Sequence, residues 1–369
     1  MHTTKFILLV VVIILIGILY KRYQEKHSYV SHLYIYDHIQ NNILLDKSLE
    51  KSKKPILWIH IPYEQNERKW LSFGSRNTYD LNQPYLNLTV KSIIKNCDKS
   101  FKICIIDDNS FEKLIPGWNI DMSLLATPIL TYVRQMSIAK LIYRYGGINV
   151  PTSFLCFKDL DSLYHKGTKY NRMFIGENVD NNITSSHNDF YPNIGLMGAE
   201  KENKTVHEFI DFMQRIISTD YTAQAEFLGD FNRWCQKRVE HNKICLINGN
   251  ELGTKTLDDE PVLVEELLGE NYVNYYKDMY GIWIPWEMIL KRTKYEWFAR
   301  MSPEQIFKGN FILAKYILLA STPDSHLGVI EPLTEKPDWV SFWKVPSGAP
   351  VWGLQPIGLG DHVPRVKNG

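Results

Sequence analysis

Cysteine is scarce in this sequence, and its few thiols follow no metal-binding or disulfide pattern. The chain has five cysteines, Cys97, Cys104, Cys156, Cys235 and Cys245, and no two of them form a C-x-x-C pair. An odd number of cysteines without such spacing indicates neither a zinc site nor a disulfide framework. Internal repeats are lacking as well, which argues against the repeat architectures.

An excess of charge of one sign is also missing. The formal net charge is +1, and no stripe of lysine and arginine recurs along the chain. Proteins that bind nucleic acid neutralise its phosphates with such stripes. The composition therefore argues against a nucleic-acid partner.

A long apolar segment stands out at the N-terminus. The run FILLVVVIILIGILY, 15 residues from Phe6 to Tyr20, contains no charge, and Lys5, Lys21 and Arg22 flank it. At about 1.5 Å per residue a helix of this run covers roughly 22 Å, less than the ~30 Å hydrocarbon core, so flanking residues must contribute. We therefore predict a transmembrane anchor over residues 6–23.

This anchor predicts a single-pass membrane protein. A cleaved signal peptide is the alternative, but no small-x-small cleavage site follows between Gly17 and His32. Basic residues flank the apolar run on both sides, so the membrane orientation stays open. An endomembrane of the ER or Golgi type and a viral or host membrane are both compatible with the sequence.

The rest of the chain is predicted to form one large α/β domain. After Pro55 a continuous apolar strand, ILWIHI, is followed by a helical pattern and a second strand, which is the β-α-β order of a parallel sheet. The predicted organisation is a tail at 1–5, the anchor at 6–23, a stalk at 24–54, the α/β domain at 55–345 and a Pro/Gly-rich tail at 346–369.

Hydrophobic periodicity places the elements of this domain. It predicts strands at 56–61, 101–106, 148–157, 173–175 and 193–199, helices within 81–96 and at 135–145, 205–218 and 223–240, and a hairpin-like stretch at 244–253. Tryptophan and tyrosine crowd residues 271–344. They could line a sugar-binding cleft, but core packing is the simpler expectation.

Two neighbouring carboxylates follow the strand predicted at 101–106. Open α/β sheets bind their ligands beyond the carboxyl ends of their strands, so Asp107 and Asp108 are candidates for ligand contacts. The alternative is that they cap the next segment or shape a turn through backbone hydrogen bonds.

The block YRYGGINVPTSFLCFKDLDSLY, from Tyr143 to Tyr164, resembles a known family signature. It is similar to the DxD sugar-transferase family that includes α-mannosyltransferases and inositol-phosphoceramide mannosyltransferases, in which a Tyr-Gly-Gly-Ile-Tyr run precedes an Asp-x-Asp pair. The similarity covers roughly residues 55–212 and implies a GT-A-like, Rossmann-like mixed sheet flanked by helices. It also implies transfer of a hexose from a nucleotide-sugar donor to a glycan or lipid acceptor.

The resemblance also implies a metal site, which this chain does not reproduce. In the family a divalent metal held by the Asp pair stabilises the leaving diphosphate, and oxygen ligands suit Mn or Mg. The matching positions are Pro151 and Ser153, and the family's Asp and Arg on the preceding helix fall on Gln135 and Ile138. The usual Asp ligands are therefore absent, so we assign no metal ligands. An active protein that binds its donor without a metal is one expectation, and Mn or Mg bound by other residues is the alternative.

The residues expected to bind the donor surround this motif and the strand ends. Basic side chains would neutralise the diphosphate, and aspartates would contact the ribose or the base. The predicted donor-binding set is Asp107, Asp108, Arg134, Arg144, Gly146, Gly147, Asn149, Ser153 and Glu177. Further candidates are Lys140 and Lys158 for the diphosphate and Glu177, Asp258, Asp259 and Glu260 for an acceptor-side carboxylate.

The alternative for Arg144 and Lys158 is that each is a solvated charge on the surface. No spacing in the sequence selects a catalytic residue.

Three functional hypotheses follow. The first is an active, metal-independent glycosyltransferase. The second is a catalytically inactive transferase fold that keeps a sugar- or protein-binding surface, which the missing Asp pair favours. The third is a membrane-tethered structural or assembly protein, in which Gly146 and Gly147 merely make a turn.

Overall fold

A computed structural model describes most of the predicted α/β domain. The described residues are 17, 49, 52–62, 85–125, 129–179, 190–219, 224–291, 293–301 and 303–321. Apart from Gly17, the predicted anchor lies outside them, as do the C-terminal tail and most of the stalk. None of the helices in the described ranges is long and apolar enough to cross a membrane.

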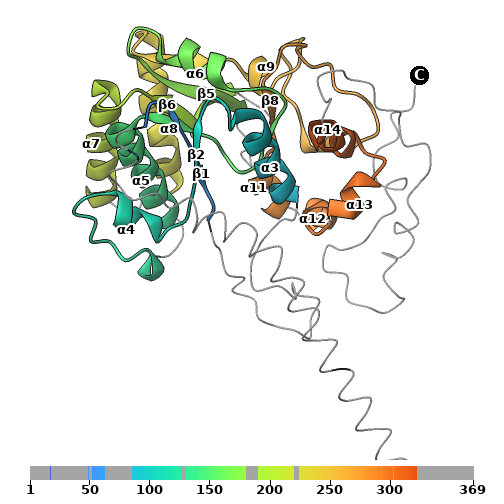
Figure 1. Ribbon diagram of the computed structural model, residues 1–369, viewed down its shortest axis with the longest axis horizontal. Helices are drawn as coiled ribbons and strands as arrows, with labels where there is room; N and C mark the ends of the chain where they lie inside the picture. The colour runs from blue at the N-terminus through green and yellow to red at the C-terminus, as the bar shows by residue number, and fades with distance from the viewer. Residues whose placement is uncertain are drawn as a thin grey trace, which may run out of the picture.

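A mixed sheet forms the centre of the molecule. Its strands are β1 (Ile56–His60), β2 (Lys102–Ile106), β3 (Gly147–Asn149), β5 (Met173–Val179), β6 (Phe190–Ala199) and β7 (Ile244–Ile247). Within the described residues these six strands have the order β2-β1-β3-β6-β5-β7. Figure 1 labels β1, β2, β5 and β6 of this sheet. Strands β1, β2 and β3 run parallel, β6 is antiparallel to β3 and β5, and β7 is parallel to β5. The predicted mixed α/β class is confirmed.

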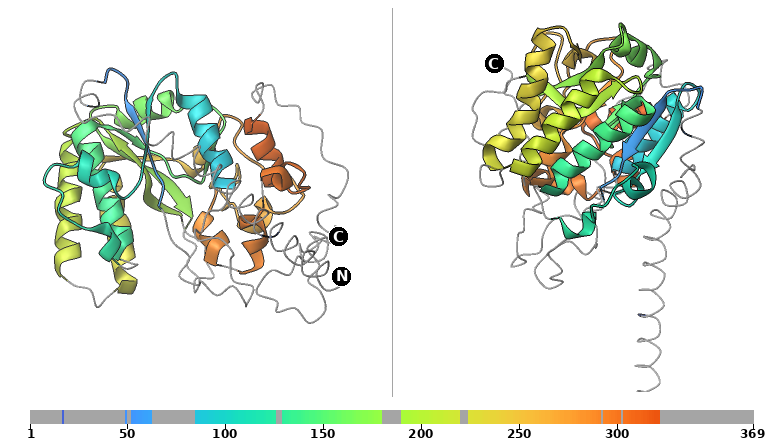
Figure 2. Two further views of the ribbon diagram at one scale, coloured as in Figure 1. Left: turned by 60° about the horizontal axis from the view of Figure 1, so that its bottom comes forward. Right: turned by 90° about the vertical axis from the view of Figure 1, so that its left-hand side faces the viewer.

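Alternate side chains of each strand point to two layers of helices. On β1, Ile56 and Trp58 join one core and Leu57 and Ile59 join the other, as the two-residue period of a strand requires. The first core is covered by α5 (Ile129–Tyr145), α7 (Lys204–Thr219) and α8 (Gln224–Glu240), and the second by α3 (Tyr85–Cys97) and α6 (Asp161–Thr168). Figure 2 shows α5, α7 and α8 side by side on their face of the sheet.

A third core lies in the C-terminal part of the described chain. It joins a small antiparallel sheet of β4 (Phe154–Cys156) and β8 (Gly281–Trp283) to short helices. These are α10 (Val264–Leu267), α11 (Trp286–Lys291), η2 (Thr293–Tyr295), α12 (Glu296–Ala299), α13 (Pro303–Phe307) and α14 (Ile312–Ser321). Aromatic residues such as Tyr295 and Phe298 are buried here, so core packing is confirmed for this part of the aromatic-rich region.

Most predicted elements are present, with shifted ends. The predicted strands at 56–61, 101–106, 173–175 and 193–199 correspond to β1, β2, β5 and β6, and the predicted helices correspond to α3, α5, α7 and α8. Helix α5 begins at Ile129, earlier than predicted, and ends at Tyr145 as predicted. Helix α6 and the short helices after residue 263 were not predicted, and neither were α4 (Ser110–Leu114), η1 (Met122–Leu124) and α9 (Gly249–Leu252).

The single strand predicted at 148–157 is wrong, because the chain changes sheets within it. Strand β3 ends at Asn149, and the chain enters the small sheet at Phe154. Pro151 has no N–H to donate to a ladder, and its carbonyl accepts a turn hydrogen bond from the amide of Phe154 at 3.0 Å.

The hairpin predicted at 244–253 is also wrong. Strand β7 pairs in parallel with β5, so it does not fold back on a neighbouring strand. The side chain of Asn248 then accepts a hydrogen bond from the amide of Asn250 and caps α9, which ends at a left-handed Gly253.

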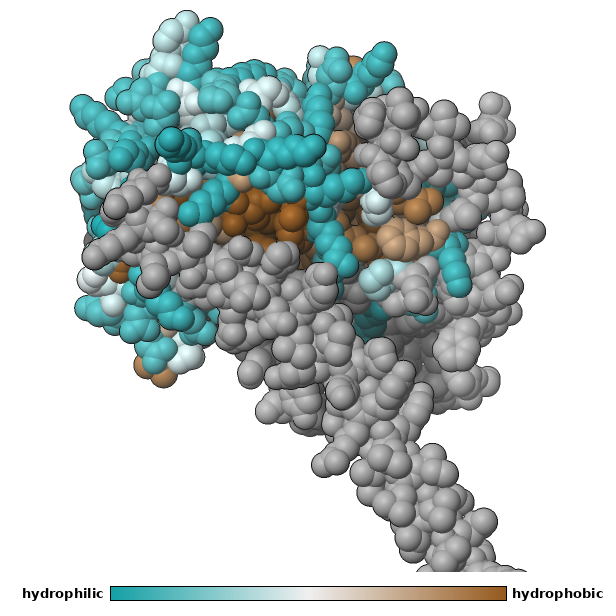
Figure 3. All heavy atoms as spheres, viewed as in Figure 1, coloured by the Kyte–Doolittle hydropathy of each residue, from teal (hydrophilic) through white to brown (hydrophobic). Residues whose placement is uncertain are grey.

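Apolar surface is visible in the middle of one face. Figure 3 shows apolar side chains between polar ones, in the region where Figure 1 draws β1, β2 and α3. Three partly buried isoleucines pack against the second core: Ile61 just after β1, Ile94 on α3 and Ile103 on β2.

Candidate functional site

The carboxyl ends of the parallel strands lie at one edge of the large sheet. Residues 57 and 58 of β1 pair with residues 148 and 149 of β3, and β1 and β2 pair in register along their whole length. Because β6 is antiparallel to both β3 and β5, β5 and β7 end at the same edge as β1, β2 and β3. We call it the carboxyl edge, and it is where open α/β sheets bind ligands.

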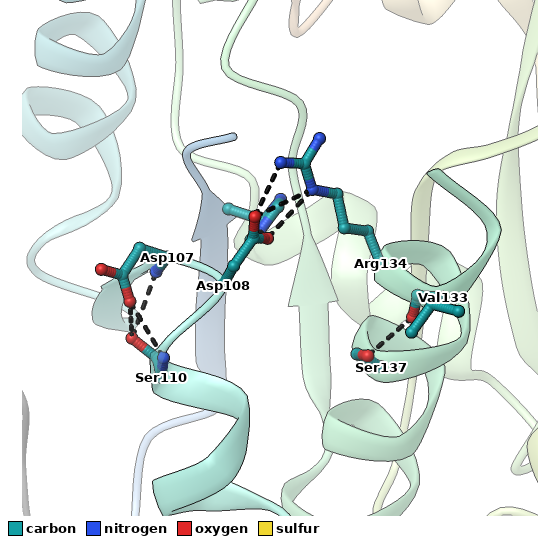
Figure 4. A network of polar contacts seen from close by, with 7 residues as sticks. Asp107, Asp108, Ser110, Val133, Arg134 and Ser137 are labelled. Atoms are coloured by element: carbon teal, nitrogen blue, oxygen red, sulfur yellow. Dashed lines mark hydrogen bonds and ion pairs between the residues drawn. The ribbon is translucent and has the colours of Figure 1, made fainter. Parts of the chain in front are cut away.

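A network of three charged or polar side chains occupies this edge beside β1 and β2. His60 is the last residue of β1, Asp108 follows β2, and Arg134 reaches toward Asp108 from the first half of α5 (Figure 4). The Arg134 Nε donates to both carboxylate oxygens of Asp108, at 3.0 and 3.2 Å, and Nη2 donates to Oδ2 at 2.7 Å. His60 Nε2 lies 2.9 Å from Oδ1 and, facing a carboxylate, is the donor.

The network holds Asp108 in its ionised form. Burial by itself would raise the pKa of Asp108, but hydrogen bonds and charge from His60 and Arg134 outweigh it and lower the pKa to about 2. All three side chains are mostly buried, with exposed fractions of 12% for His60, 20% for Asp108 and 8% for Arg134. At neutral pH the site therefore offers a fixed, ionised hydrogen-bond acceptor.

Asp107 has a different task from its neighbour. Its Oδ1 accepts from the amide of Ser110 at 2.9 Å and from the Ser110 hydroxyl at 2.6 Å, and its own amide donates to that hydroxyl. Asp107 thus shapes the turn that leads into α4, which is one of the local roles considered for it as the alternative to ligand binding.

A second ion pair lies at the carboxyl edge beside β5. Glu177 Oε2 accepts from the amide of Gly249 at 2.8 Å and lies 3.0 Å from Lys255 Nζ. Lys255 Nζ is also 3.7 Å from Asp259 and 4.2 Å from the ring centroid of Phe190. Lys255 therefore brings together two of the predicted carboxylates, Glu177 and Asp259.

Two buried polar oxygens in the segment from β3 to β4 have no partner among the described residues. Asn149, the last residue of β3, donates from Nδ2 to the carbonyl of Gly195 at 2.8 Å, but its buried Oδ1 has no hydrogen bond within the described part of the chain. Ser153, in the crossover, is fully buried, and its Oγ likewise has no partner in the described ranges. Unpaired buried oxygens are uncommon, because each costs about 1–3 kcal/mol.

The residues present do not fit a divalent metal at the family's Asp-x-Asp positions. Pro151 has no side-chain donor, and the single oxygen of Ser153 is a fully buried hydroxyl. The nearby Asp108 carboxylate is already bound by Arg134 and His60. Mg or Mn would need several oxygen ligands around it, which this donor set does not supply.

Gly146, Gly147 and Arg144 lie at the opposite edge of the sheet. Gly147 begins β3 next to Ile56, the first residue of β1, and Gly146 accepts a hydrogen bond from Trp58 Nε1 at 3.0 Å. Arg144 is ten residues beyond Arg134 on α5, or about 15 Å along the helix. The structure therefore does not bring these three residues together with Asp108.

The two glycines are required by the backbone. Gly146 has φ +74° and ends α5, while Gly147 has φ +105°, and a Cβ on Gly147 would lie 2.0 Å from the carbonyl oxygen of Ile56. A side chain at this position would collide with β1. The Gly-Gly turn thus sets how α5 leads into the sheet.

The remaining candidates are dispersed. Lys140 lies 5.8 Å from the ring centroid of Trp118, and burial lowers its pKa. Lys158 donates to the carbonyl of Asp278 and lies over the ring of Tyr280. Asp258 accepts from Asn274 at 3.1 Å and, like Asp259 and Glu260, is exposed in the turn after α9.

Sequence reasoning missed His60 and Lys255. The sequence contained a signal for His60, because His60 ends a buried parallel strand and Asp107 and Asp108 were chosen for following one. Lys255 had no comparable signal, because its contact with Glu177 depends on the loop after α9 folding back onto β5.

No protein-family model matches this chain, and no curated protein matches it. The class established by the structure is therefore the architecture alone, a mixed α/β sheet flanked by helices.

Proposed function

We propose that this chain is a membrane-anchored, GT-A-like glycosyltransferase that transfers a hexose from a nucleotide-sugar to a glycan or lipid acceptor without a metal. The observation that carries the proposal is the gathering of polar side chains from separate segments at the carboxyl edge. His60, Asp108, Arg134, Asn149 and Glu177 all lie there. Ligands of open α/β sheets bind at this edge.

The fold agrees with the sequence resemblance on which the proposal rests. Three parallel strands lead into an antiparallel strand, β6, within one sheet, and the segment matching the Asp-x-Asp pair crosses from β3 to the small sheet. This crossover begins at the carboxyl edge. The resemblance places donor contacts in the same segment.

Each ion pair at the edge has a role in this proposal. Asp108, which remains ionised at neutral pH, holds the side chains of His60 and Arg134 in place at the carboxyl edge. Arg134 supplies positive charge for the diphosphate, whereas Lys255, beyond β3 and β6 in the strand order, holds Glu177 in position as the acceptor-side carboxylate. Asn149 Oδ1, which has no hydrogen-bond partner among the described residues, lies at the carboxyl edge and accepts a hydrogen bond from the donor in this proposal.

A thermal-shift panel on the full chain in detergent tests this proposal. The ligands are UDP-, GDP- and CMP-sugars, each with and without Mn²⁺. A ligand at a hundred times its Kd stabilises the folded state by about 2.7 kcal/mol, which corresponds to several degrees in Tm. We expect one donor to raise Tm equally with and without Mn²⁺ and to release its nucleotide, UDP, GDP or CMP, on incubation with an acceptor.

The Asp108→Asn variant should lose the donor-dependent shift, whereas Asp98→Asn should keep it. Asp98 follows α3 and is exposed, so this control makes the same change of charge away from the site. A shift of the same size in Asp108→Asn and the wild type would contradict the assignment of Asp108. No shift with any donor would contradict donor binding altogether.

A catalytically inactive transferase fold is the second candidate, and the chemistry of the crossover favours it. Proline and a buried serine stand where the family has two carboxylates. This alternative predicts glycan binding without release of a nucleotide. A membrane-tethered structural or assembly protein would show neither.

A further inference from the structure

Two of the five cysteines meet in the folded chain although 58 residues separate them in sequence. Cys97 is the last residue of α3, and Cys156 is the last residue of β4. Their Sγ atoms lie 4.0 Å apart, and both side chains are fully buried. The sulfurs of a disulfide are about 2.05 Å apart, so these two sulfur atoms would have to move about 2 Å closer to form a bond.

The backbones that carry the two thiols are fastened to each other. Ser92 Oγ accepts from the amide of Cys156 at 2.9 Å. Asn96 Nδ2 donates to the carbonyl of Cys156 at 3.0 Å and to the carbonyl of Ser92 at 2.9 Å. Both contacts come from the last turns of α3, so the end of β4 is held against the end of this helix whether or not the thiols react.

The pair is protected once the chain has folded. Burial and the hydrogen bond with Cys97 raise the pKa of Cys156, whose thiol donates to the carbonyl of Lys158 at 3.1 Å. Because thiolates rather than thiols attack disulfides, the folded pair reacts slowly. The bond therefore forms during folding or local opening and is then hidden from reductants.

We propose that Cys97 and Cys156 form a structural disulfide, which links α3 to β4, when the domain is exposed to small-molecule disulfides such as oxidised glutathione. One cysteine, as thiolate, attacks the reagent and releases a glutathione thiolate. The second cysteine then attacks the mixed disulfide and releases another. The two protons from the cysteines go to the two released thiols, so the protein dithiol is oxidised as one reagent disulfide is reduced.

The link would lie next to the crossover that begins at the carboxyl edge. Thr89 of α3 donates to the carbonyl of Thr152, in the crossover that leads into β4. A bond between Cys97 and Cys156 would close the loop that runs from the end of α3 through β2, α5, β3 and this crossover to the end of β4, and it would restrict how far α3 and β4 can separate. It would also indicate an oxidising compartment for the domain, because such bonds persist in lumenal and extracellular spaces.

Thiol mapping on the full chain in detergent tests the pair directly. The reduced protein is unfolded in urea, refolded in the presence of oxidised glutathione, quenched with acid, unfolded again, alkylated with N-ethylmaleimide and digested for mass spectrometry. Cys245 is only partly buried and lies in β7, so its glutathione adduct reports that the oxidant was active. We expect a cross-linked peptide that contains Cys97 and Cys156.

Full alkylation of Cys97 and Cys156 under conditions that modify Cys245 would overturn the proposal. Pairing of either residue with another cysteine, or a stable glutathione adduct on either, would overturn it as well.

Thermal denaturation gives a second readout. The oxidised wild type should melt several degrees above the reduced wild type, and Cys97→Ala and Cys156→Ala should show no such difference. Cys235→Ala is the matched control, because Cys235 is equally buried but belongs to α8, and it should keep the difference. An equal redox shift in all three variants would contradict the pair, and the thiol map of the wild type decides the outcome if a variant fails to fold.

Discussion

Neighbouring residues of the same type perform different tasks at the carboxyl edge. Asp107 shapes the turn before α4 through Ser110, whereas Asp108 forms an ion pair with Arg134 and a hydrogen bond with His60. A one-residue step along the chain separates a structural role from a candidate binding role. Sequence spacing alone could not assign them, because both tasks use the same carboxylate chemistry.

At this scale Asp108→Asn should weaken the fold in a pH-dependent way. The pKa of Asp108 falls from an ordinary 3.8 to about 2, so in the wild type its stabilising contribution is present above about pH 4 and is lost as the pH falls toward 2. The shift is equivalent to about 2 kcal/mol of unfolding free energy, and the variant also leaves the buried Arg134 without its counter-ion. Urea unfolding at pH 7 and pH 3 should show the gap between variant and wild type shrink at the lower pH.

Asp98→Asn serves as the control for this pH effect. The exposed Asp98 should give a loss below about 0.5 kcal/mol at both pH values. A constant gap between Asp108→Asn and the wild type from pH 7 to pH 3 would rule out the ionised ion pair as its cause.

Gly147→Ala should destabilise the protein more than a glycine substitution in an open turn. The new Cβ would meet the Ile56 carbonyl oxygen at 2.0 Å, and φ +105° is unfavourable for alanine. We expect a loss of about 3–5 kcal/mol. Gly117→Ala is the matched control, since Gly117 has φ +71° but no atom within 4 Å of an added Cβ, and about 1 kcal/mol is expected there. Similar losses in chemical denaturation would refute the close contact with β1.

At the scale of elements, hydrophobic periodicity predicted a helix or strand correctly where the segment has one apolar face or is a continuous apolar run. Strands β1 and β2 are continuous apolar runs, and α3 and α7 have apolar residues at helical spacing. It failed at 148–157 because an apolar run does not reveal which sheet it enters. The change of partner from β1 to β8 is visible only in the strand pairing.

The attachment of β4 to α3 can be tested with Ser92→Ala. This change removes the acceptor of the buried Cys156 amide and should cost about 1–2 kcal/mol. Hydrogen exchange should become faster in the peptide that contains β4 but stay unchanged in β1. Ser218→Ala, at an exposed position near the end of α7, should change neither. Unchanged exchange of β4 in Ser92→Ala would show that this contact does not hold the strand.

At the scale of the whole molecule, the predicted anchor and the folded domain should be separable. Leu49 has only 3% of its surface exposed and joins the first core, so a truncation must leave it in place. Removal of residues 1–23 should release the protein from membranes and from its need for detergent. The far-ultraviolet circular dichroism and Tm should stay unchanged.

Flotation of cell membranes measures this prediction, with removal of residues 1–5 as the control that should stay in the membrane fraction. If the chain without residues 1–23 still floats with the membranes, the N-terminal run is not the anchor.

The sequence by itself determined the α/β class, the order of the main strands and helices, and the place of Asp108 at a strand end. Those features follow from hydrophobic period and from chain order, which are local or nearly local properties. Only the tertiary structure decided that Arg134 and His60 share Asp108, that Arg144 and the Gly-Gly turn lie at the opposite edge, and that Cys97 meets Cys156. These contacts depend on which strands pair and on how α3 and α5 pack against the sheets, and no local pattern in the chain encodes that choice.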